Sequence, residues 1–213
     1  MRRGGIAVEP LIHGIILAFG LILPLGVQNV FVFNQGATHK KFTNAIPAVV
    51  TAGICDTLLI YMAVAGVSVI VFSFEWLKIL LFGVGLFFLA YMGWIIWKDR
   101  PEVNGNTEGN RFSTRRQITF AASVSLLNPH AILDTIGVIG TSSLTYSGYD
   151  KWVFMIGCIV VSWIWFISLA VVGRKIGQFN GTGNFLKRIN QISAIIIWIM
   201  AIYMGYQVYL LLI

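Results

Sequence analysis

The sequence predicts an all-α membrane protein whose six transmembrane helices form two inverted three-helix repeats. Three observations lead to this fold class: the composition, the length of the apolar runs and a pattern shared by the two halves. Hydrophobic residues make up 57% and charged residues 11% of the 213 positions, and the mean hydropathy is +0.82. A soluble domain has about 25% charged residues. Because a water-facing surface needs those charges, this chain must have little of it.

Six stretches are apolar over the length that a helix needs to cross a bilayer, which is about 20 residues. They are Leu11–Phe33, Ala45–Phe72, Trp76–Trp97, Ile118–Ser143, Trp152–Gly173 and Ile192–Leu212. Tryptophan or tyrosine lies near the ends of several runs, as is typical of the two membrane interfaces. The runs are too long and too continuous for the strands of a membrane barrel, so we expect helices.

The connections between these runs differ in charge. Eleven of the fifteen lysines and arginines fall in the first, third and fifth connections: Lys40, Lys41, Lys98, Arg100, Arg111, Arg115, Arg116, Arg174, Lys175, Lys187 and Arg188. The positive-inside rule therefore predicts these connections in the cytoplasm and both termini outside. The same rule explains the net charge of +7 without nucleic acid, because no basic stripe with interleaved aromatics is present.

The third connection, 98–117, is the only long polar stretch and has the composition of a flexible linker. It divides one transmembrane domain, residues 1–213, into halves of about 8–98 and 117–213. Tyr91-Met92-Gly93 recurs as Tyr203-Met204-Gly205 at an offset of 112. In the second and fifth runs Ala63-Val64-Ala65-Gly66 matches Ala170-Val171-Val172-Gly173 at an offset of 107, where Cys55-Asp56 faces Ser162-Trp163. Each half has three spans, an odd number, so the second half must be inserted upside down, as in many secondary transporters.

The first and fourth runs, which hold corresponding places in the halves, are both interrupted by proline. Proline removes a backbone donor and breaks or kinks a helix. The first break lies at Pro24 and Gly26, and the second at Pro129. The polar residues beside the breaks are Gln28, Asn29, Asn128 and His130. Unwound backbone at membrane depth is tolerated where it lines a cavity or is buried, so the matched pair predicts a substrate site near the midplane.

Two aspartates lie inside apolar runs, Asp56 in the second and Asp134 in the fourth. A charge at the bilayer centre costs about 2.5–3.5 kcal/mol on insertion scales, so such residues usually face a polar cavity. No lysine or arginine is expected at membrane depth to neutralise them, because Lys78 lies at the end of its run. A proton, a metal ion or a cationic substrate must do so, although Asp134 could also cap the broken helix.

The remaining reactive residues give weaker signals. His13 lies near a membrane boundary, where an interfacial role is expected, whereas His130 adjoins the break and is a candidate ligand or proton carrier. Asn34-Gln35-Gly36 reads as a polar exit from the first helix. Cys55 and Cys158 sit in apolar runs without CxxC spacing and are expected to be packing residues. No pattern indicates an enzyme or a cofactor.

The residues around the breaks resemble a known family. Gly26-Val27-Gln28-Asn29, Cys55-Asp56, Leu127-Asn128-Pro129-His130 with Leu133-Asp134-Thr135, and Ser162-Trp163 are together similar to the LysE-type exporters of lysine and arginine, in order and spacing over nearly the whole chain. One position departs from the family, because Val27 stands where its first motif has proline. The resemblance implies export of basic amino acids across a bacterial inner membrane. The wider family also exports neutral amino acids, and related families move metal ions.

The expected mechanism follows from the inverted halves, which would rock around a midplane site and open alternately to each side. The substrate-binding residues would be Gly26, Gln28, Asn29, Asp56, Asn128, Pro129, His130 and Asp134. Helix N-termini and the amides would meet the substrate carboxylate, and the aspartates its cationic groups and the exchanging protons. The partners expected are therefore a small basic amino acid, protons and lipid, with self-association into a homo-oligomer left open. A metal exporter is the main rival, although two aspartates and one well-placed histidine are a thin ligand set.

Overall fold

The computed structural model describes residues 8–22, 26–39, 41–66, 74–98, 113–127, 131–132, 135–179 and 183–212, and these are mostly helical, with no strands among them. The helices are α1 (Val8–Ile22), α2 (Val27–Thr38), α3 (Ile46–Val64), α5 (Glu75–Lys98), α6 (Thr114–Leu126), α8 (Gly140–Ser143), α9 (Tyr149–Phe179) and α10 (Gly183–Leu212). Two short elements complete them, the 3-10 helix η1 (Phe42–Asn44) and the π-helix η3 (Thr135–Ile139). The all-helical prediction is confirmed for these residues.

Three described helical stretches are long and apolar enough to cross a membrane by themselves: Ile46–Val64, Tyr149–Gln178 and Asn190–Leu212. A fourth results when α1 and α2, which are bent by 80° at the break between them, are counted as one interrupted span. The apolar part of α5, Phe82–Lys98, is shorter. By length and composition, the described residues thus contain three or four candidate spans, whereas the whole sequence predicts six.

The helix ends differ from the predicted runs where composition hides a turn. The second run was expected to reach Phe72, but α3 ends at Val64, and Gly66 follows with a φ of 97°. That conformation favours glycine because it carries no Cβ. Conversely, α9 and α10 extend beyond their apolar runs through polar turns, α10 beginning at Gly183 rather than near Ile192. Backbone geometry therefore sets these boundaries more than hydropathy does.

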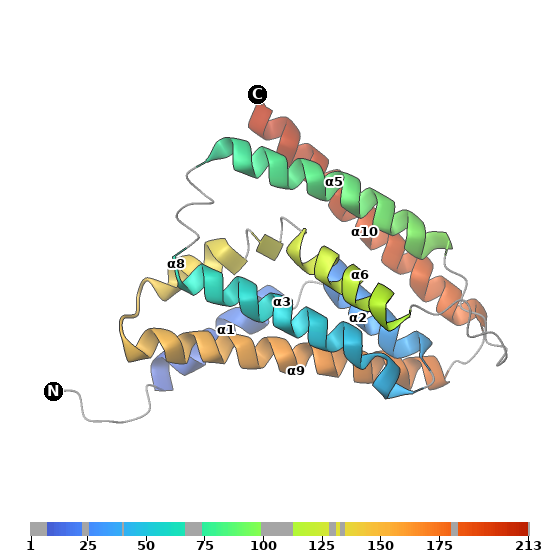
Figure 1. Ribbon diagram of the computed structural model, residues 1–213, viewed down its shortest axis with the longest axis horizontal. Coiled ribbons are helices and arrows are strands. Elements are labelled where there is room, and N and C mark those ends of the chain that lie inside the picture. The colour runs from blue at the N-terminus through green and yellow to red at the C-terminus, as the bar shows by residue number, and fades with distance from the viewer. Residues whose placement is uncertain are drawn as a thin grey trace.

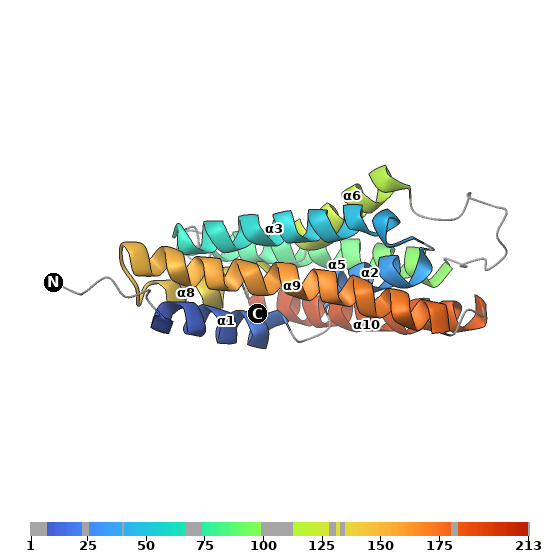
Figure 2. The same ribbon diagram turned by 90° about the horizontal axis from the view of Figure 1, so that it is seen from below.

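The helices run roughly parallel to the long axis of the bundle (Figures 1 and 2). α1 begins and α10 ends toward one end, whereas α2, α5 and α9 end toward the other, where α3, α6 and α10 begin (Figure 1). α5 lies against α10, and this pair forms one side of the molecule in Figure 1. α1 and α2 both pack against α9, while α6 and η3 pack against α3.

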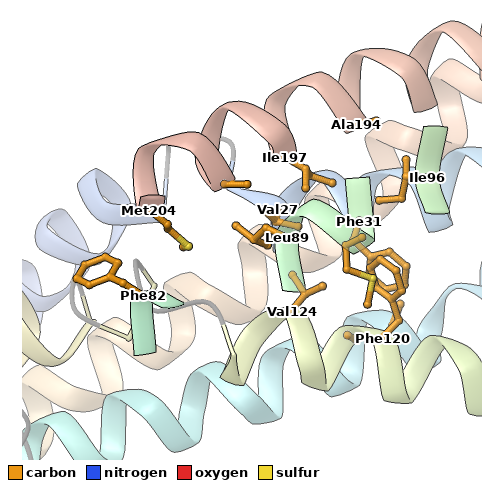
Figure 3. Close-up of a cluster of buried hydrophobic side chains, with 14 residues drawn as sticks. Val27, Phe31, Phe82, Leu89, Ile96, Phe120, Val124, Ala194, Ile197 and Met204 are labelled. Carbon is orange, nitrogen blue, oxygen red and sulfur yellow. The ribbon is translucent and has the colours of Figure 1, made fainter. Parts of the chain in front are cut away.

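The largest apolar cluster joins the α5–α10 pair to the rest of the bundle (Figure 3). Val27 and Phe31 of α2, with Phe120 and Val124 of α6, meet side chains of α5 and α10 there. The rings of Phe31 and Phe120 stack with 4.2 Å between their centroids. Burial of this cluster holds the segment that follows the first break against the segment that precedes the second.

Candidate functional site

The first predicted break is present, and the side chain of Asn29 spans it. α1 ends at Ile22 and α2 begins at Val27. The last carbonyls of a helix have no partner within it. The Asn29 Nδ2 donates to the Ile22 carbonyl oxygen at 2.9 Å and so satisfies one of them. Asn29 is buried, and this contact holds the start of α2 against the end of α1.

The N-terminus of α2 has no side-chain cap. Gly26 occupies the N-cap position in an extended conformation, and its carbonyl accepts from the Val30 backbone amide at 3.1 Å. Val27 is the first helical residue and is fully buried in the apolar cluster. Proline is favoured at this first position because its missing donor has no helical partner there. Valine also fits it, so the departure from the family motif falls where proline and valine are both compatible with the break.

Gln28 connects the break to α3. Its Nε2 donates to the Ala52 carbonyl oxygen, a long contact of 3.4 Å, and its side chain is buried. Ala52 lies one helical turn before Asp56. The amide of Gln28 therefore brings the start of α2 close to the part of α3 that carries the predicted intramembrane charge.

Asp56 lies where α3 crosses α9. Its side chain is half-buried, and the Ser162 hydroxyl donates a hydrogen bond to its Oδ2. At the next residue, the Trp163 indole Nε1 donates to the Thr57 Oγ1 at 3.1 Å. No lysine, arginine or histidine of the described ranges forms an ion pair with Asp56.

The second predicted break lies largely outside the described residues, as do Asn128, Pro129, His130 and Asp134. Pro24 of the first break lies outside them as well. What flanks the second break is described: α6 ends at Leu126, and η3 begins at Thr135. Ile132 and Ile136 pack against Leu59 and Ala63 of α3, so the neighbourhood of this break also faces the helix that bears Asp56.

A buried polar cluster near the start of α6 was not predicted. Asn34-Gln35-Gly36 was expected to be a polar exit from the first helix, but α2 continues to Thr38 and all three residues are buried. This is a correction, and its cause is close packing: a Cβ on Gly36 would lie 2.2 Å from the Ala170 carbonyl oxygen of α9. The polar contacts of the cluster join Gln35 to His39 at 3.2 Å, His39 to Gln117 at 3.1 Å and Asn34 to Ser193 at 3.2 Å.

The remaining candidates have ordinary surroundings. The Nδ1 of His13 lies 2.8 Å from the Tyr146 hydroxyl oxygen, and its ring packs against Phe154, near the end of the bundle where α1 begins. Cys55 and Cys158 are free and buried. Among the residues with described positions, no group of three or more His, Cys, Asp or Glu side chains could hold a metal ion.

Comparison with known proteins extends these observations. The LysE type translocator family matches residues 19–208. A Bacillus subtilis (strain 168) protein named as a candidate amino-acid transporter, YisU, is 54% identical over 208 residues, which cover 98% of this chain and 94% of that protein. The arginine exporter protein ArgO of Shigella flexneri and that of Escherichia coli (strain K12) are each 29% identical over 193 residues, covering 89% of this chain and 90% of theirs. No solved structure matches the chain.

The family match covers most of the sequence, and its members are translocators rather than enzymes. It includes both predicted breaks and both intramembrane aspartates. The apolar helices of the structure agree with a protein of this kind. The chain belongs to the LysE type translocator family.

Proposed function

We propose that this protein exports basic L-amino acids, arginine or lysine, across the bacterial inner membrane in exchange for protons. The half-buried carboxylate of Asp56 carries the proposal. It lies at the contact between α3 and α9, which belong to different halves of the chain, and no basic side chain of the described ranges pairs with it. The ArgO proteins, named as arginine exporters, support the choice of a cationic cargo.

The proposed architecture has six spans in two inverted halves, and the pattern of helix contacts supports it. In the first half, α1 and α2 pack on α9, the second helix of the other half. In the second half, α6 and η3 pack on α3, the second helix of the first half. α3 pairs with α9 and α5 with α10. Helices of each half thus pack on the second helix of the other half. A two-fold axis in the membrane plane between inverted repeats would produce this pattern.

The proposed orientation places both termini outside. Most of the basic residues lie in the connections after α2, α5 and α9 or in the helix ends that flank them, and α2, α5 and α9 end toward one end of the bundle (Figure 1). The positive-inside rule assigns that end to the cytoplasm. Reporter fusions after Leu212 test the assignment: periplasmic alkaline phosphatase should be active there, and activity of a cytoplasmic reporter instead would reverse the orientation.

In the proposed cycle, the uncapped start of α2 and the amides of Gln28, Asn29 and Asn128 meet the substrate carboxylate, beside Gly26 and Pro129. Asp56 and Asp134 bind its cationic groups, and His130 contributes to proton movement. Moving one positive charge outward against an interior-negative potential costs about 2.3 kcal/mol per 100 mV. Inward movement of one proton cancels this cost. A carboxylate that binds either the substrate or a proton, but not both, couples the two movements.

The test of cargo is accumulation from dipeptides. Cells with and without the protein are fed lysine-, arginine- or leucine-containing dipeptides, and the free amino acid is measured inside and outside. We expect faster export of lysine or arginine only. Equal rates for leucine would favour the alternative, a neutral amino-acid exporter, and no difference for any of the three would contradict export altogether. Full efflux with an unchanged pH dependence in D56N would contradict the proposed coupling.

A further inference from the structure

Ser162 is the single polar residue in a buried stripe along α9. Phe154, Cys158, Ser162, Phe166 and Ala170 follow one another at four-residue spacing, and each is at most 1% exposed. Residues four apart lie on one face of a helix. Apolar side chains on this face pack against neighbouring helices, so a hydroxyl among them must find a partner or leave a buried polar group unsatisfied, which is costly.

The usual partner for such a hydroxyl is the carbonyl oxygen four residues earlier in its own helix. Ser168 of α9 follows this rule by donating to Ile164 at 2.7 Å, and Ser125 of α6 donates to Ala121 at 2.7 Å. Thr57, beside Asp56, donates to Gly53 at 2.7 Å. Ser162 departs from the rule, because its hydroxyl donates to Asp56 on another helix.

Contacts beside this hydrogen bond hold Asp56 and Ser162 at the same level of the α3–α9 crossing. The indole of Trp163 lies over Gly53, where a Cβ would be 2.9 Å from the ring, and donates to Thr57. The hydroxyl hydrogen of Thr57 is already given to Gly53, so its oxygen is the acceptor. Cys158, one turn before Ser162, donates to the Gly14 carbonyl oxygen of α1 at 3.4 Å. The position of Ser162 relative to Asp56 is therefore fixed from both sides.

We infer that Ser162 is a positioning residue for substrate binding. Its hydrogen bond holds one carboxylate oxygen of Asp56 and leaves the other directed toward the cationic group of a basic amino acid. Because Asp56 and Ser162 come from different halves, the orientation of the carboxylate depends on how α3 and α9 lie against each other. The inference rests on the proposed function, and it adds a specificity determinant from the second half to the site.

The purified full-length protein in proteoliposomes tests this inference with labelled arginine as the probe. S162A removes the hydroxyl, and S162C keeps the volume of the side chain with a much weaker donor. Hydrogen bonds to charged groups contribute about 1.5–3 kcal/mol. We therefore expect both variants to raise the KM for arginine at least about tenfold, while the maximal rate changes less than about threefold. S168A, which removes an exposed hydroxyl bonded within α9, is the matched control and should match the wild type.

Three outcomes distinguish a failure of this inference about Ser162 from a failure of the proposed function. If D56N raises the KM and S162C does not, Asp56 binds substrate but Ser162 does not position it, and the inference fails alone. If D56N leaves the KM unchanged, the proposed role of Asp56 fails. A fall in maximal rate with an unchanged KM in S162A and S162C would give Ser162 a structural role only. In the D56N background S162A should have no further effect on the KM, because the acceptor of its bond has lost its charge.

Discussion

Among the helix contacts that join the halves of the molecule, two crossings are built alike, α3 with α9 and α5 with α10. At the first, Gly53 of α3 lies beneath the indole of Trp163. At the second, Gly93 of α5 lies beneath the indole of Trp198 from α10. In both, the indole N–H donates back to the helix that bears the glycine, to Thr57 Oγ1 at 3.1 Å and to the Ala90 carbonyl oxygen at 3.2 Å.

The crossings differ in one feature, the carboxylate. Asp56 and Ser162 add a charge-bearing hydrogen bond to the first, whereas Trp198 at the second contacts the ring of Trp97 and donates to a backbone carbonyl. Leu89 of α5 and Ile197 and Met204 of α10 are buried in one apolar cluster (Figure 3). Because glycine and tryptophan join the second pair without a carboxylate, we expect that Asp56 is not needed to hold α3 against α9. In the proposed function, binding of the substrate accounts for the cost of this carboxylate in the membrane.

The largest effect is expected at the carboxylate. Asp56→Asn keeps the size of the side chain and the acceptor for Ser162 but removes the charge. We expect arginine export to fall about 100-fold, which corresponds to about 2.7 kcal/mol of lost interaction. Rates of efflux from dipeptide-fed cells, normalised to protein in the membrane, measure it. If the amount of the variant in the membrane fell as much as export does, the charge would support folding, contrary to what the comparison of the two crossings predicts.

The glycines should give the next effect, and its size should differ between the crossings. A Cβ at Gly93 would lie 2.3 Å from the Trp198 Nε1, whereas at Gly53 it would lie 2.9 Å from the Trp163 ring. Overpacking of this kind costs about 1–3 kcal/mol. Gly93→Ala should therefore lower the midpoint of thermal unfolding in detergent more than Gly53→Ala. The reverse order would mean that the α3–α9 crossing is the more rigid of the two.

The sequence predicts features that depend on local interactions better than features that depend on contacts between residues distant in sequence. The first break is predictable, because proline and glycine act on their own backbone, and α1 and α2 are indeed separate helices. The alignment of Cys55-Asp56 with Ser162-Trp163 at an offset of 107 relates the two halves, but it does not predict that these residues meet, as they do in the hydrogen bonds of Ser162 to Asp56 and of Trp163 to Thr57.

The partner of Asp56 and the burial of the polar cluster are not predictable in the same way. Nothing local to Ser162 distinguishes it from Ser168, since both are serines in the same apolar helix, and only the tertiary crossing gives one of them a carboxylate. Burial of Asn34 and Gln35 likewise depends on glycine contacts with a helix distant in sequence. The end of α3 was missed because an apolar run continues past the turn at Gly66.

The indole hydrogen bonds should contribute less than the glycines. Trp163→Phe and Trp198→Phe each remove one donor and keep most of the ring, and a neutral hydrogen bond contributes about 0.5–1.5 kcal/mol. We expect similar small losses of thermal stability. Only Trp163→Phe should change transport, with a KM for arginine raised about twofold to threefold, because Trp163 adjoins the residue that holds Asp56. An equal change of KM in Trp198→Phe would show that the α5–α10 crossing also contributes to the site.

The smallest effect is expected on the outer face of the α5–α10 pair. Phe87 and Ile202 are exposed by 77% and 72%, although both are large and apolar. In water, burial of such side chains would be favourable by about 1.5–3 kcal/mol, so their exposure would favour self-association. In lipid the surrounding chains are as apolar as the side chains, and this driving force is absent. Phe87→Leu and Ile202→Leu should therefore leave both unfolding temperature and KM within error of the wild type. A clear loss of stability or of oligomer in either variant, measured by light scattering in detergent, would mean that this face contacts protein, and that the outer helix pair does more than cover the crossing that carries Asp56.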